Sequence, residues 1–283
     1  MHGKGLKTSK GMRNRMLSEE ALRIDPQSVY IQIRDFILET VRASGLEGAI
    51  VAVSGGIDSA VTLAMASRAL GEEKVRALTM PECDITPSSD VTDVINLTEA
   101  LGVTCDIVEI TPVINAMRST LSLYDPSDLV SSGNIKPRVR MMVSYHFANT
   151  LHLMVIGSSN KSELLTGYFT KYGDGGVDLM PIGDLYKTQV RQLAKHIGIP
   201  HRIIEKTPTA GLWPGQTDEE ELGVDYRTLD LILFGLERGM NTSEISRAVG
   251  TDKSVVEGVM SMVRGSEHKR RLPLLLRLSL GRS

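Results

Sequence analysis

The chain has 283 residues, of which 41% are hydrophobic, and its formal net charge is −2, with 32 Lys and Arg against 34 Asp and Glu. This length suits one large α/β domain or two small ones, and the balanced charge argues against a surface that coats nucleic acid or a membrane. No apolar run reaches the ~20 residues that span a bilayer, and the basic start, residues 1–15, lacks the apolar centre of a signal peptide. We therefore expect a cytoplasmic protein whose cysteines, Cys83 and Cys105, are reduced and form no metal or redox pair.

The first half of the chain alternates between short apolar strands and amphipathic helices. A helix should begin at Asp25-Pro26, an N-cap followed by a proline at the first helical position, and end at Gly45. We expect strands at residues 50–53, 75–80 and 105–110, with helices between them. This order with short connections predicts a doubly wound, mainly parallel sheet with helices on both faces, whose ligand lies beyond the carboxyl ends of the strands.

The turn between the first strand and its helix has the composition of a phosphate-binding site. Its residues are Ala52, Val53, Ser54, Gly55, Gly56, Ile57, Asp58 and Ser59. The glycines let the backbone approach a ligand, the serine hydroxyls can donate, and unpaired N–H groups at the helix start favour an anion. Asp58 would repel phosphate unless a cation lies between them, which implies Mg²⁺. The alternative is an ordinary strand–turn–helix connection with a Gly-Gly turn.

A second polar turn follows the predicted fourth strand, residues 152–156. Before that strand we expect a loop with a turn at residues 131–134 and then a helix over residues 139–150. The strand leads into Gly-Ser-Ser-Asn-Lys-Ser-Glu, which ends at Glu163. If this strand lies beside the first one, both turns open into one crevice and Glu163 could face Asp58 across a metal ion. Glu163 could instead merely complement the dipole of the helix that follows.

Two lysines in the second half lie where a positive charge suggests a ligand. Lys171 lies between aromatic residues in a segment, residues 167–178, that is too rich in glycine for a regular element, although a plain surface loop is the alternative. Lys187 falls in the first turn of a helix expected over residues 185–197. A lysine there opposes the helix dipole, so a ligand anion would be a reasonable compensation.

The C-terminal third combines an irregular segment with short helices. Prolines, glycines and the only tryptophan lie between residues 206 and 226, and we interpret residues 208–226 as a lid. Asp218 should begin a short acidic helix within it, which is a structural role. The C-terminal part, residues 227–283, is expected to be helical, and its helix, Gly250 turn and second helix could form a DNA-reading module. That second helix is nearly neutral, which argues against phosphate binding.

Several motifs occur together in a characteristic order. They are Ser-Gly-Gly-Ile-Asp-Ser, Asn-Ile-Lys-Pro-Arg-Val-Arg-Met-Met, the turn that ends at Glu163, Tyr-Phe-Thr-Lys-Tyr-Gly-Asp-Gly-Gly, the lid and Glu-His-Lys-Arg. This set resembles ammonia-dependent NAD synthetase of the ATP pyrophosphatase (PP-loop) superfamily over about residues 25–273. The first motif is shared by all PP-loop enzymes, whereas the Tyr-Phe-Thr-Lys-Tyr loop is nearly diagnostic. The resemblance implies an adenine nucleotide alpha hydrolase-like fold in a single domain, residues 25–283, after an arm of residues 1–24.

The resemblance also implies a reaction and a set of site residues. The carboxylate of deamido-NAD would attack the α-phosphate of ATP, pyrophosphate would leave, and ammonia would displace AMP to give NAD. ATP would be held by residues 52–59 and by Ser158, Lys187 and Thr209, where Ser158 replaces the threonine of many relatives and keeps its hydroxyl. Deamido-NAD would be held by Arg138, Lys171, Asp178, His268 and Lys269. Asp58 and Glu163 would bind Mg²⁺, and the catalytic residues would be Asp58, Lys171 and Lys187, the two lysines balancing charge on the phosphates.

Relatives of this kind are homodimers whose dinucleotide site spans the interface, so the resemblance implies a homodimer without nucleic-acid or membrane partners. About fifty residues precede the nucleotide turn, which is too short for the amidase domain of glutamine-using relatives. Free ammonia or a separate glutaminase would then supply the nitrogen. The rival interpretations are another PP-loop adenylating ligase, such as a GMP synthetase or a tRNA-thiolating enzyme, and a non-catalytic nucleotide-binding module.

Overall fold

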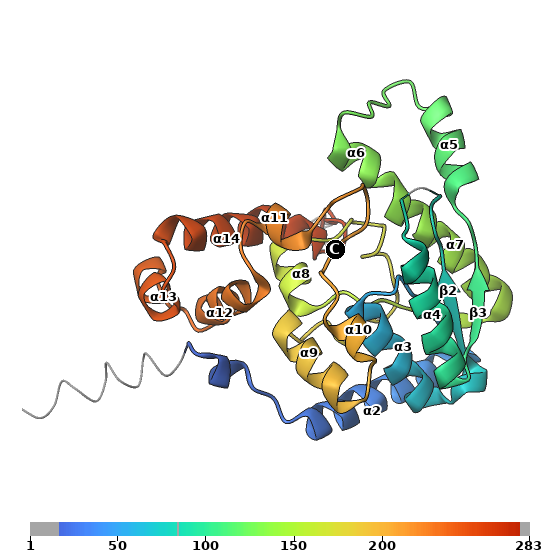
Figure 1. Cartoon of the computed structure of the whole chain (residues 1–283), viewed down its shortest axis with the longest axis horizontal. Coiled ribbons are helices and arrows are strands. Elements are labelled where there is room, and N and C mark those ends of the chain that lie inside the picture. The colour runs from blue at the N-terminus through green and yellow to red at the C-terminus, as the bar shows by residue number, and fades with distance from the viewer. Residues whose placement is uncertain (1–16, 84, 278–283) are drawn as a thin grey trace, which may run out of the picture.

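The computed structural model describes residues 17–83 and 85–277 (Figure 1). At its centre is a sheet of four parallel strands in the order β3-β2-β1-β4. Their bounds are β1 Gly48–Ala52, β2 Val75–Thr79, β3 Thr104–Ile107 and β4 Leu153–Ile156. The parallel sheet predicted from the sequence is therefore confirmed, with strand ends that differ from the predicted ones by a few residues.

Helices cover both faces of this sheet because the buried residues of β1 alternate between them. Ala49 and Val51 face one side, which is covered by α2 Pro26–Ser44, α3 Ile57–Leu70, α4 Ser88–Leu101 and α9 Lys187–His196. Ile50 faces the other side, where it packs with residues of α5 Thr111–Thr120 and α7 Ile135–Leu151. A strand buried on both faces is typical of a parallel sheet, so the doubly wound arrangement is confirmed.

The first helix shows how closely local signals set its ends. The Asp25 carboxylate accepts a hydrogen bond from Gln27 N, Pro26 occupies the first helical position, and Gly45 ends α2 with a φ of +73°. An aspartate N-cap and a left-handed glycine satisfy backbone groups that a helix end leaves unpaired. The predicted start and end of this helix are both confirmed.

The segment between β3 and α7 was predicted as a loop, and that prediction is wrong. It contains α5 and a short helix α6, Leu129–Gly133, so residues 131–133 are helical rather than a turn. Pro112 at the start of α5 and the Asp128 carboxylate, which accepts from Ser131 N, provide the helix starts. The two helices form the projection at the upper right of Figure 1. The helix predicted from residue 139 begins earlier, at Ile135, because Pro137 fits a first helical turn.

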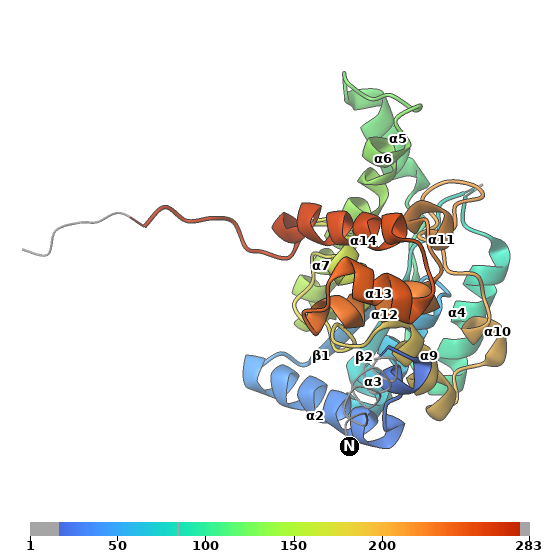
Figure 2. The same ribbon diagram turned by 90° about the vertical axis from the view of Figure 1, so that its left-hand side faces the viewer.

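A separate helical lobe packs against one end of the sheet domain, at the left of Figure 1 and the front of Figure 2. It consists of α12 Tyr226–Glu237, α13 Thr242–Val249 and α14 Lys253–Gly265, with Gly250 in a left-handed conformation between the last two. Leu17 and Leu22, which flank or lie in the short helix Glu19–Leu22, are buried in the same core. Residues 1–16 of the predicted arm lie outside the described residues. None of the described helices is both long and apolar enough to cross a membrane.

Candidate active site

The sheet order brings the two predicted polar turns to one place. β1 lies between β2 and β4, with Val51 opposite Ile156, so the chain passes to the other side of β1 when it forms β4. The turns after β1 and β4 therefore leave the sheet at the same edge, where the strand order reverses. Open α/β sheets bind ligands in the crevice at such a point.

The turn after β1 is held in shape by a glycine and by its own serines. Gly55 has a φ of +80°, and a Cβ there would lie 2.9 Å from the carbonyl oxygen of Asp90. The Ser59 hydroxyl accepts a hydrogen bond from Ser54 N and donates one to Gly56 O, which ties the turn to the start of α3. These contacts leave a tight backbone turn in which only glycine fits at position 55.

The other predicted residues of this turn contribute mainly backbone. Val53 and Ile57 are buried in the sheet core, and Ala52 ends β1. Two charged residues that we did not predict lie beside the turn: Lys206 Nζ lies 2.6 Å from Asp90 Oδ1 and 3.4 Å from Gly55 O. No short-range pattern could have found this contact, because Lys206 and Gly55 are 151 positions apart.

Asp58, Glu163 and Lys187 form one buried cluster at the crevice. Lys187 Nζ lies 2.5 Å from Asp58 Oδ2 and 3.3 Å from Glu163 Oε1, and only 3% of the lysine side chain is exposed. Asn160 Nδ2 donates to the other oxygen of Asp58 at 3.1 Å. Both predicted metal ligands, Asp58 and Glu163, thus contact the ammonium group of Lys187. Lys187 does not need the ligand anion that we expected, because these two carboxylates already compensate its charge.

Glu163 also lies in the first turn of a helix, where its alternative explanation placed it, and its role as a metal ligand stays a prediction. The Asn160 side chain accepts from Glu163 N, and Glu163 Oε2 accepts from Asn160 N, which forms a capping box at the start of α8 Lys161–Thr166. The second oxygen, Oε1, binds Lys187. The capping box fixes the rotamer of Glu163 and thereby aims this oxygen at the lysine.

Asp230 of the helical lobe helps to hold the start of α9, which carries Lys187. Lys187 N donates to the Ser162 hydroxyl, and Thr188 N donates to Asp230 Oδ2, at 3.0 and 2.8 Å. Ser162 in turn donates to Asp230 Oδ1 at 2.5 Å. Burial raises the pKa of Asp230 to about 6, although these hydrogen bonds favour its charged form. Asp230 therefore caps the start of α9, and sequence reasoning missed it because it lies 42 positions from Thr188.

Burial and mutual charge perturb the protonation of the cluster. Burial raises the pKa of Glu163 to about 8, because it and the repulsion from Asp58 outweigh the attraction of Lys187. Burial lowers the pKa of Lys187, but Asp58 and Glu163 outweigh that effect, so the lysine pKa is raised. With all three groups ionised the cluster has one negative charge in excess. A proton on Glu163 makes the cluster neutral, and the raised pKa favours that form as the pH falls.

Asp218, for which we predicted only a structural role, lies beside this cluster as well. It begins α11 Asp218–Leu222 in the lid and is 4% exposed. Its Oδ2 accepts from the Tyr226 hydroxyl at 2.9 Å, whereas its buried Oδ1 has no hydrogen-bond partner. Lys187 Nζ lies 4.9 Å from the centroid of the Tyr226 ring, which joins this pair to the cluster. Burial raises the pKa of Asp218, opposed by Lys187 and by the bond to Tyr226.

Four of the predicted deamido-NAD residues form a second group. Lys171 Nζ donates to His268 O at 2.7 Å, and the Arg138 guanidinium donates to Lys171 O at 3.4 Å. Lys269 Nζ donates to the carbonyl oxygens of Gly167 and Phe169, so it holds the glycine-rich loop. The contacts of Lys171 join it to this group rather than to Lys187. The predicted catalytic residues therefore belong to two neighbourhoods, whose roles stay predictions.

The remaining predicted residues lie at the edges of the site. Asp178 accepts from the Tyr145 hydroxyl and from Val155 N, both at 2.9 Å, so each carboxylate oxygen already has one protein partner. A carboxylate oxygen keeps a further lone pair for a ligand. Ser158 follows β4 and is half-buried, and the exposed Thr209 accepts from Gly211 N in the lid.

The site suits Mg²⁺ only together with phosphate oxygens. Among the residues that the structure describes, no group of three or more His, Cys, Asp and Glu side chains is arranged to hold a metal ion. Asp58 and Glu163 nevertheless both contact the ammonium group of Lys187. Asp218 Oδ1 is buried and has no hydrogen-bond partner. Because Mg²⁺ in nucleotide sites is usually bound by one or two carboxylates and by phosphates, these residues fit an ion that arrives with ATP.

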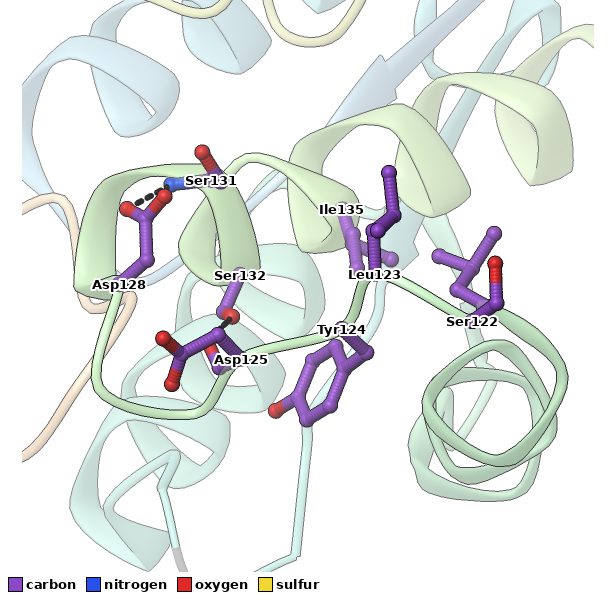
Figure 3. Close-up of a pocket in the computed structure, with 9 residues that line it drawn as sticks. Ser122, Leu123, Tyr124, Asp125, Asp128, Ser131, Ser132 and Ile135 are labelled. Atoms are coloured by element: carbon purple, nitrogen blue, oxygen red, sulfur yellow. Dashed lines mark hydrogen bonds between the residues drawn. The ribbon is translucent and has the colours of Figure 1, made fainter.

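A shallow pocket elsewhere on the molecule does not belong to this site. It lies on the projection between α5 and α7 and is lined by Leu123, Tyr124, Asp128 and neighbouring residues (Figure 3). Its polar groups are engaged locally, since Asp128 accepts from Ser131 N and the Ser132 hydroxyl donates to Asp125 O. None of the predicted site residues lines this pocket.

Comparisons with known proteins agree with this geometry. A family model described as NAD synthase matches residues 29–273. An NH3-dependent NAD+ synthetase from Archaeoglobus fulgidus is 46% identical over 252 residues, which are 89% of this chain and 97% of that protein. One from Pyrococcus horikoshii is 44% identical over 246 residues, 87% and 94% of the two chains.

Solved structures give the same result. An NMN synthetase from Francisella tularensis matches with a TM-score of 0.80 and 31% identity, over 90% of this chain and all of that one. An NH3-dependent NAD synthetase from Campylobacter jejuni, in complex with the nitrate ion, matches with a TM-score of 0.76 and 31% identity over the same shares. The family model and these relatives extend over most of the chain, and the chain belongs to the NAD synthase family.

Proposed function

We propose that this chain amidates deamido-NAD with ammonia and ATP and releases NAD, AMP and pyrophosphate. Relatives named NH3-dependent NAD+ synthetase at 42–46% identity support the reaction. The observation that carries the proposal for this chain is the convergence of Asp58, Glu163 and Lys187 at the crevice between β1 and β4. A non-catalytic binding module would not need a lysine buried with two acids beside a phosphate-binding turn.

The turn and its neighbours would receive the triphosphate of ATP. Backbone N–H groups at the start of α3 and the exposed Ser54 hydroxyl are available as donors. Lys187 and Lys206 supply positive charge on two sides of the turn. Mg²⁺ bound by Asp58 and Glu163 would neutralise phosphate oxygens as a Lewis acid.

The first step needs no protein nucleophile. A carboxylate oxygen of deamido-NAD attacks the α-phosphorus of ATP, the bond from that phosphorus to the bridging oxygen breaks, and pyrophosphate leaves with the electron pair. Charge increases on the leaving group, where the ammonium of Lys187 would stabilise it. Positioning and electrostatics would therefore supply the catalysis.

The second step exchanges AMP for nitrogen. Ammonia attacks the carbonyl carbon of the adenylate, the bond from that carbon to the AMP oxygen breaks, and one proton leaves the nitrogen as the amide forms. We assign Lys171, Arg138, Asp178, His268 and Lys269 to the deamido-NAD substrate. The contact of Lys171 with His268 supports a common binding surface on the glycine-rich loop and the C-terminal segment.

A second candidate substrate is the mononucleotide. The match to an NMN synthetase, with a TM-score of 0.80, favours testing the amidation of nicotinate mononucleotide as well. The chemistry of adenylation and amidation would be the same, since only the part of the substrate remote from the carboxylate differs. Greater identity to the NAD+ synthetases makes the dinucleotide our first choice.

We also propose that the protein is a cytoplasmic homodimer that uses free ammonia or ammonia from a separate glutaminase. Exposed apolar side chains on α6 and α7 support an interface there: Val130 is 62% exposed and Met142 51%. Burial of these side chains against a second copy of the chain would remove their apolar surface from water.

The test is a reaction of the purified chain with ATP, Mg²⁺ and ammonium and either deamido-NAD or nicotinate mononucleotide. We expect NAD and AMP in equal amounts from the dinucleotide, with a kcat/KM well above that for the mononucleotide. A higher kcat/KM for the mononucleotide would reassign the substrate. Unchanged ATP with both substrates would refute the enzyme proposal.

A further inference from the structure

A buried ion pair lies apart from the catalytic cluster, at the end of the crevice near β2. Lys136 in the first turn of α7 and Glu82 in the connection after β2 are 4% and 2% exposed. Lys136 Nζ lies 2.7 Å from Glu82 Oε2, an ion-pair distance, although the contact does not have hydrogen-bond geometry. The other oxygen of Glu82 binds Arg118 at 3.1 Å. A buried pair of this kind contributes little net stability to the fold.

The lysine also binds the lid. Lys136 Nζ donates to the carbonyl oxygen of Leu212 at 2.5 Å, and the N–H of Leu212 donates to Gln216 Oε1 at 2.7 Å. Both backbone groups of Leu212 are therefore fixed. A donor carried by a charged group makes a stronger hydrogen bond than a neutral one. This bond connects the sheet domain to the middle of residues 209–217 of the lid.

Trp213 packs at the same place. A Cβ on Gly133, the last residue of α6, would lie 3.2 Å from the Trp213 ring and 3.4 Å from Leu212 Cβ. A side chain at position 133 would therefore displace the indole ring from this position by at least a few tenths of an ångström. The lid thus docks on α6 and α7 through one hydrogen bond and one aromatic contact.

Residues 209–217 of the lid are held at both ends independently of this contact. Lys206, just before the lid, binds Asp90 beside the nucleotide turn. At the far end, Asp218 N donates to Pro208 O, and the Asp218 carboxylate accepts from Tyr226. Residues 209–217 therefore form a closed loop whose middle is placed by Lys136 and Gly133. This loop includes Thr209, the residue assigned to ATP.

We propose that the Glu82–Lys136 pair positions the lid over the nucleotide crevice, with Glu82 holding the ammonium of Lys136 where it binds Leu212. This inference rests on the proposed function for its effect on ATP, but its effect on the lid does not. Neither residue touches the predicted catalytic groups, so both are positioning residues. Since Glu82 follows β2 and Lys136 begins α7, the pair also ties the lid to two elements of the sheet domain at once.

The test replaces the pair without leaving a buried charge. In the double variant Glu82→Leu/Lys136→Met, apolar side chains of similar size take the place of both ions, a change that usually preserves folding. Loss of the charged hydrogen bond to Leu212 should shift the equilibrium between docked and undocked lid ten- to hundredfold. Trp213 is the only tryptophan of the chain, so its fluorescence reports the lid directly.

We expect acrylamide to quench Trp213 at least twice as strongly in the double variant as in the unmodified protein, without any substrate present. With substrates, the KM for ATP should rise about tenfold or more while kcat changes by less than about threefold. Arg118→Met is the matched control, since it removes the other partner of Glu82 and leaves Lys136 with Leu212. It should leave both quenching and KM unchanged.

A second variant disturbs the contact of Trp213 with α6 instead of the ion pair. Gly133→Leu keeps the ion pair but fills the space of the Trp213 ring, and it should also increase quenching. Unchanged quenching in both variants would overturn the proposal, as would an Arg118→Met variant with the same defects as the double variant. If the unmodified protein makes no NAD, the proposed function fails, whereas the substrate-free quenching still decides the role of the pair.

Discussion

Replacing Glu163 with glutamine should make the stability of the protein less dependent on pH. Glutamine keeps the size of the side chain and the oxygen that accepts from Asn160 N, so the start of α8 is retained. Lys187 keeps its closer partner, Asp58, at 2.5 Å. The change removes one titrating group from the cluster and places an amide NH2 opposite Lys187 in place of Oε1, a cost that does not vary with pH.

The sign and size of the effect follow from the pKa of Glu163, which burial raises from 4.5 to about 8. The folded protein binds this proton more tightly than the unfolded chain does, so its stabilising contribution is complete below pH 4.5 and is lost as the pH rises towards 8. At 1.36 kcal/mol for each unit of pKa, the loss between pH 5.5 and 8.5 comes to about 3 kcal/mol. Because 15% of the side chain is exposed, we expect about 2 to 3 kcal/mol.

Urea unfolding followed by far-UV circular dichroism, with EDTA and without nucleotide, measures this loss. The difference in unfolding free energy between the Glu163→Gln variant and the unmodified protein should grow by about 2 to 3 kcal/mol from pH 5.5 to pH 8.5. Glu244→Gln is the matched control, since Glu244 occupies the same position of an Asn-x-x-Glu capping box at the start of α13, with its hydrogen bonds exposed. A difference that stays constant with pH, or an equal change in the control, would refute our account of the cluster.

Two further variants test the turn itself. Asp58→Asn should reduce turnover at least a hundredfold while urea unfolding stays cooperative, because Glu163, freed from the repulsion of Asp58, can ionise and neutralise Lys187. Turnover near that of the unmodified protein would remove Asp58 from the mechanism. Gly55→Ala should destabilise the protein by about 2 to 4 kcal/mol. The φ of +80° at this position disfavours a side chain, and the added Cβ would lie 2.9 Å from Asp90 O. Because each kcal/mol corresponds to about 2–4 °C, a thermal midpoint within 2 °C of the original would contradict this prediction.

The sheet could be predicted from the sequence because each of its strands is a short apolar run bounded by turn residues. Local signals such as Asp25-Pro26 and Gly45 also set helix ends correctly. The helices α5 and α6 were missed because each buries few side chains. The regular spacing of apolar residues that identifies longer helices therefore extends over too few residues there. Pro112 and Asp128 were available as start signals and would have found them.

The candidate site could be predicted only where its residues carry a recognisable pattern. Asp58 and Glu163 each follow a strand, and the parallel order of the strands brought them together. Other residues packed around this cluster, Asp218, Tyr226 and Asp230, come from the lid and the helical lobe. Nothing in their local sequence indicates that they face the ends of these strands. Contacts between distant segments depend on how the lobe docks, which periodicity and capping do not encode.

The separation of Asp58 and Lys187 along the chain also has a consequence for biosynthesis. A ribosome that has made the first 150 residues has released the phosphate-receiving turn with its aspartate, but not the lysine 129 positions later that offsets this charge. Contacts across so long a stretch form late in folding. A chain that ends before this lysine would present an anionic turn that repels nucleotides, so we expect it not to capture ATP.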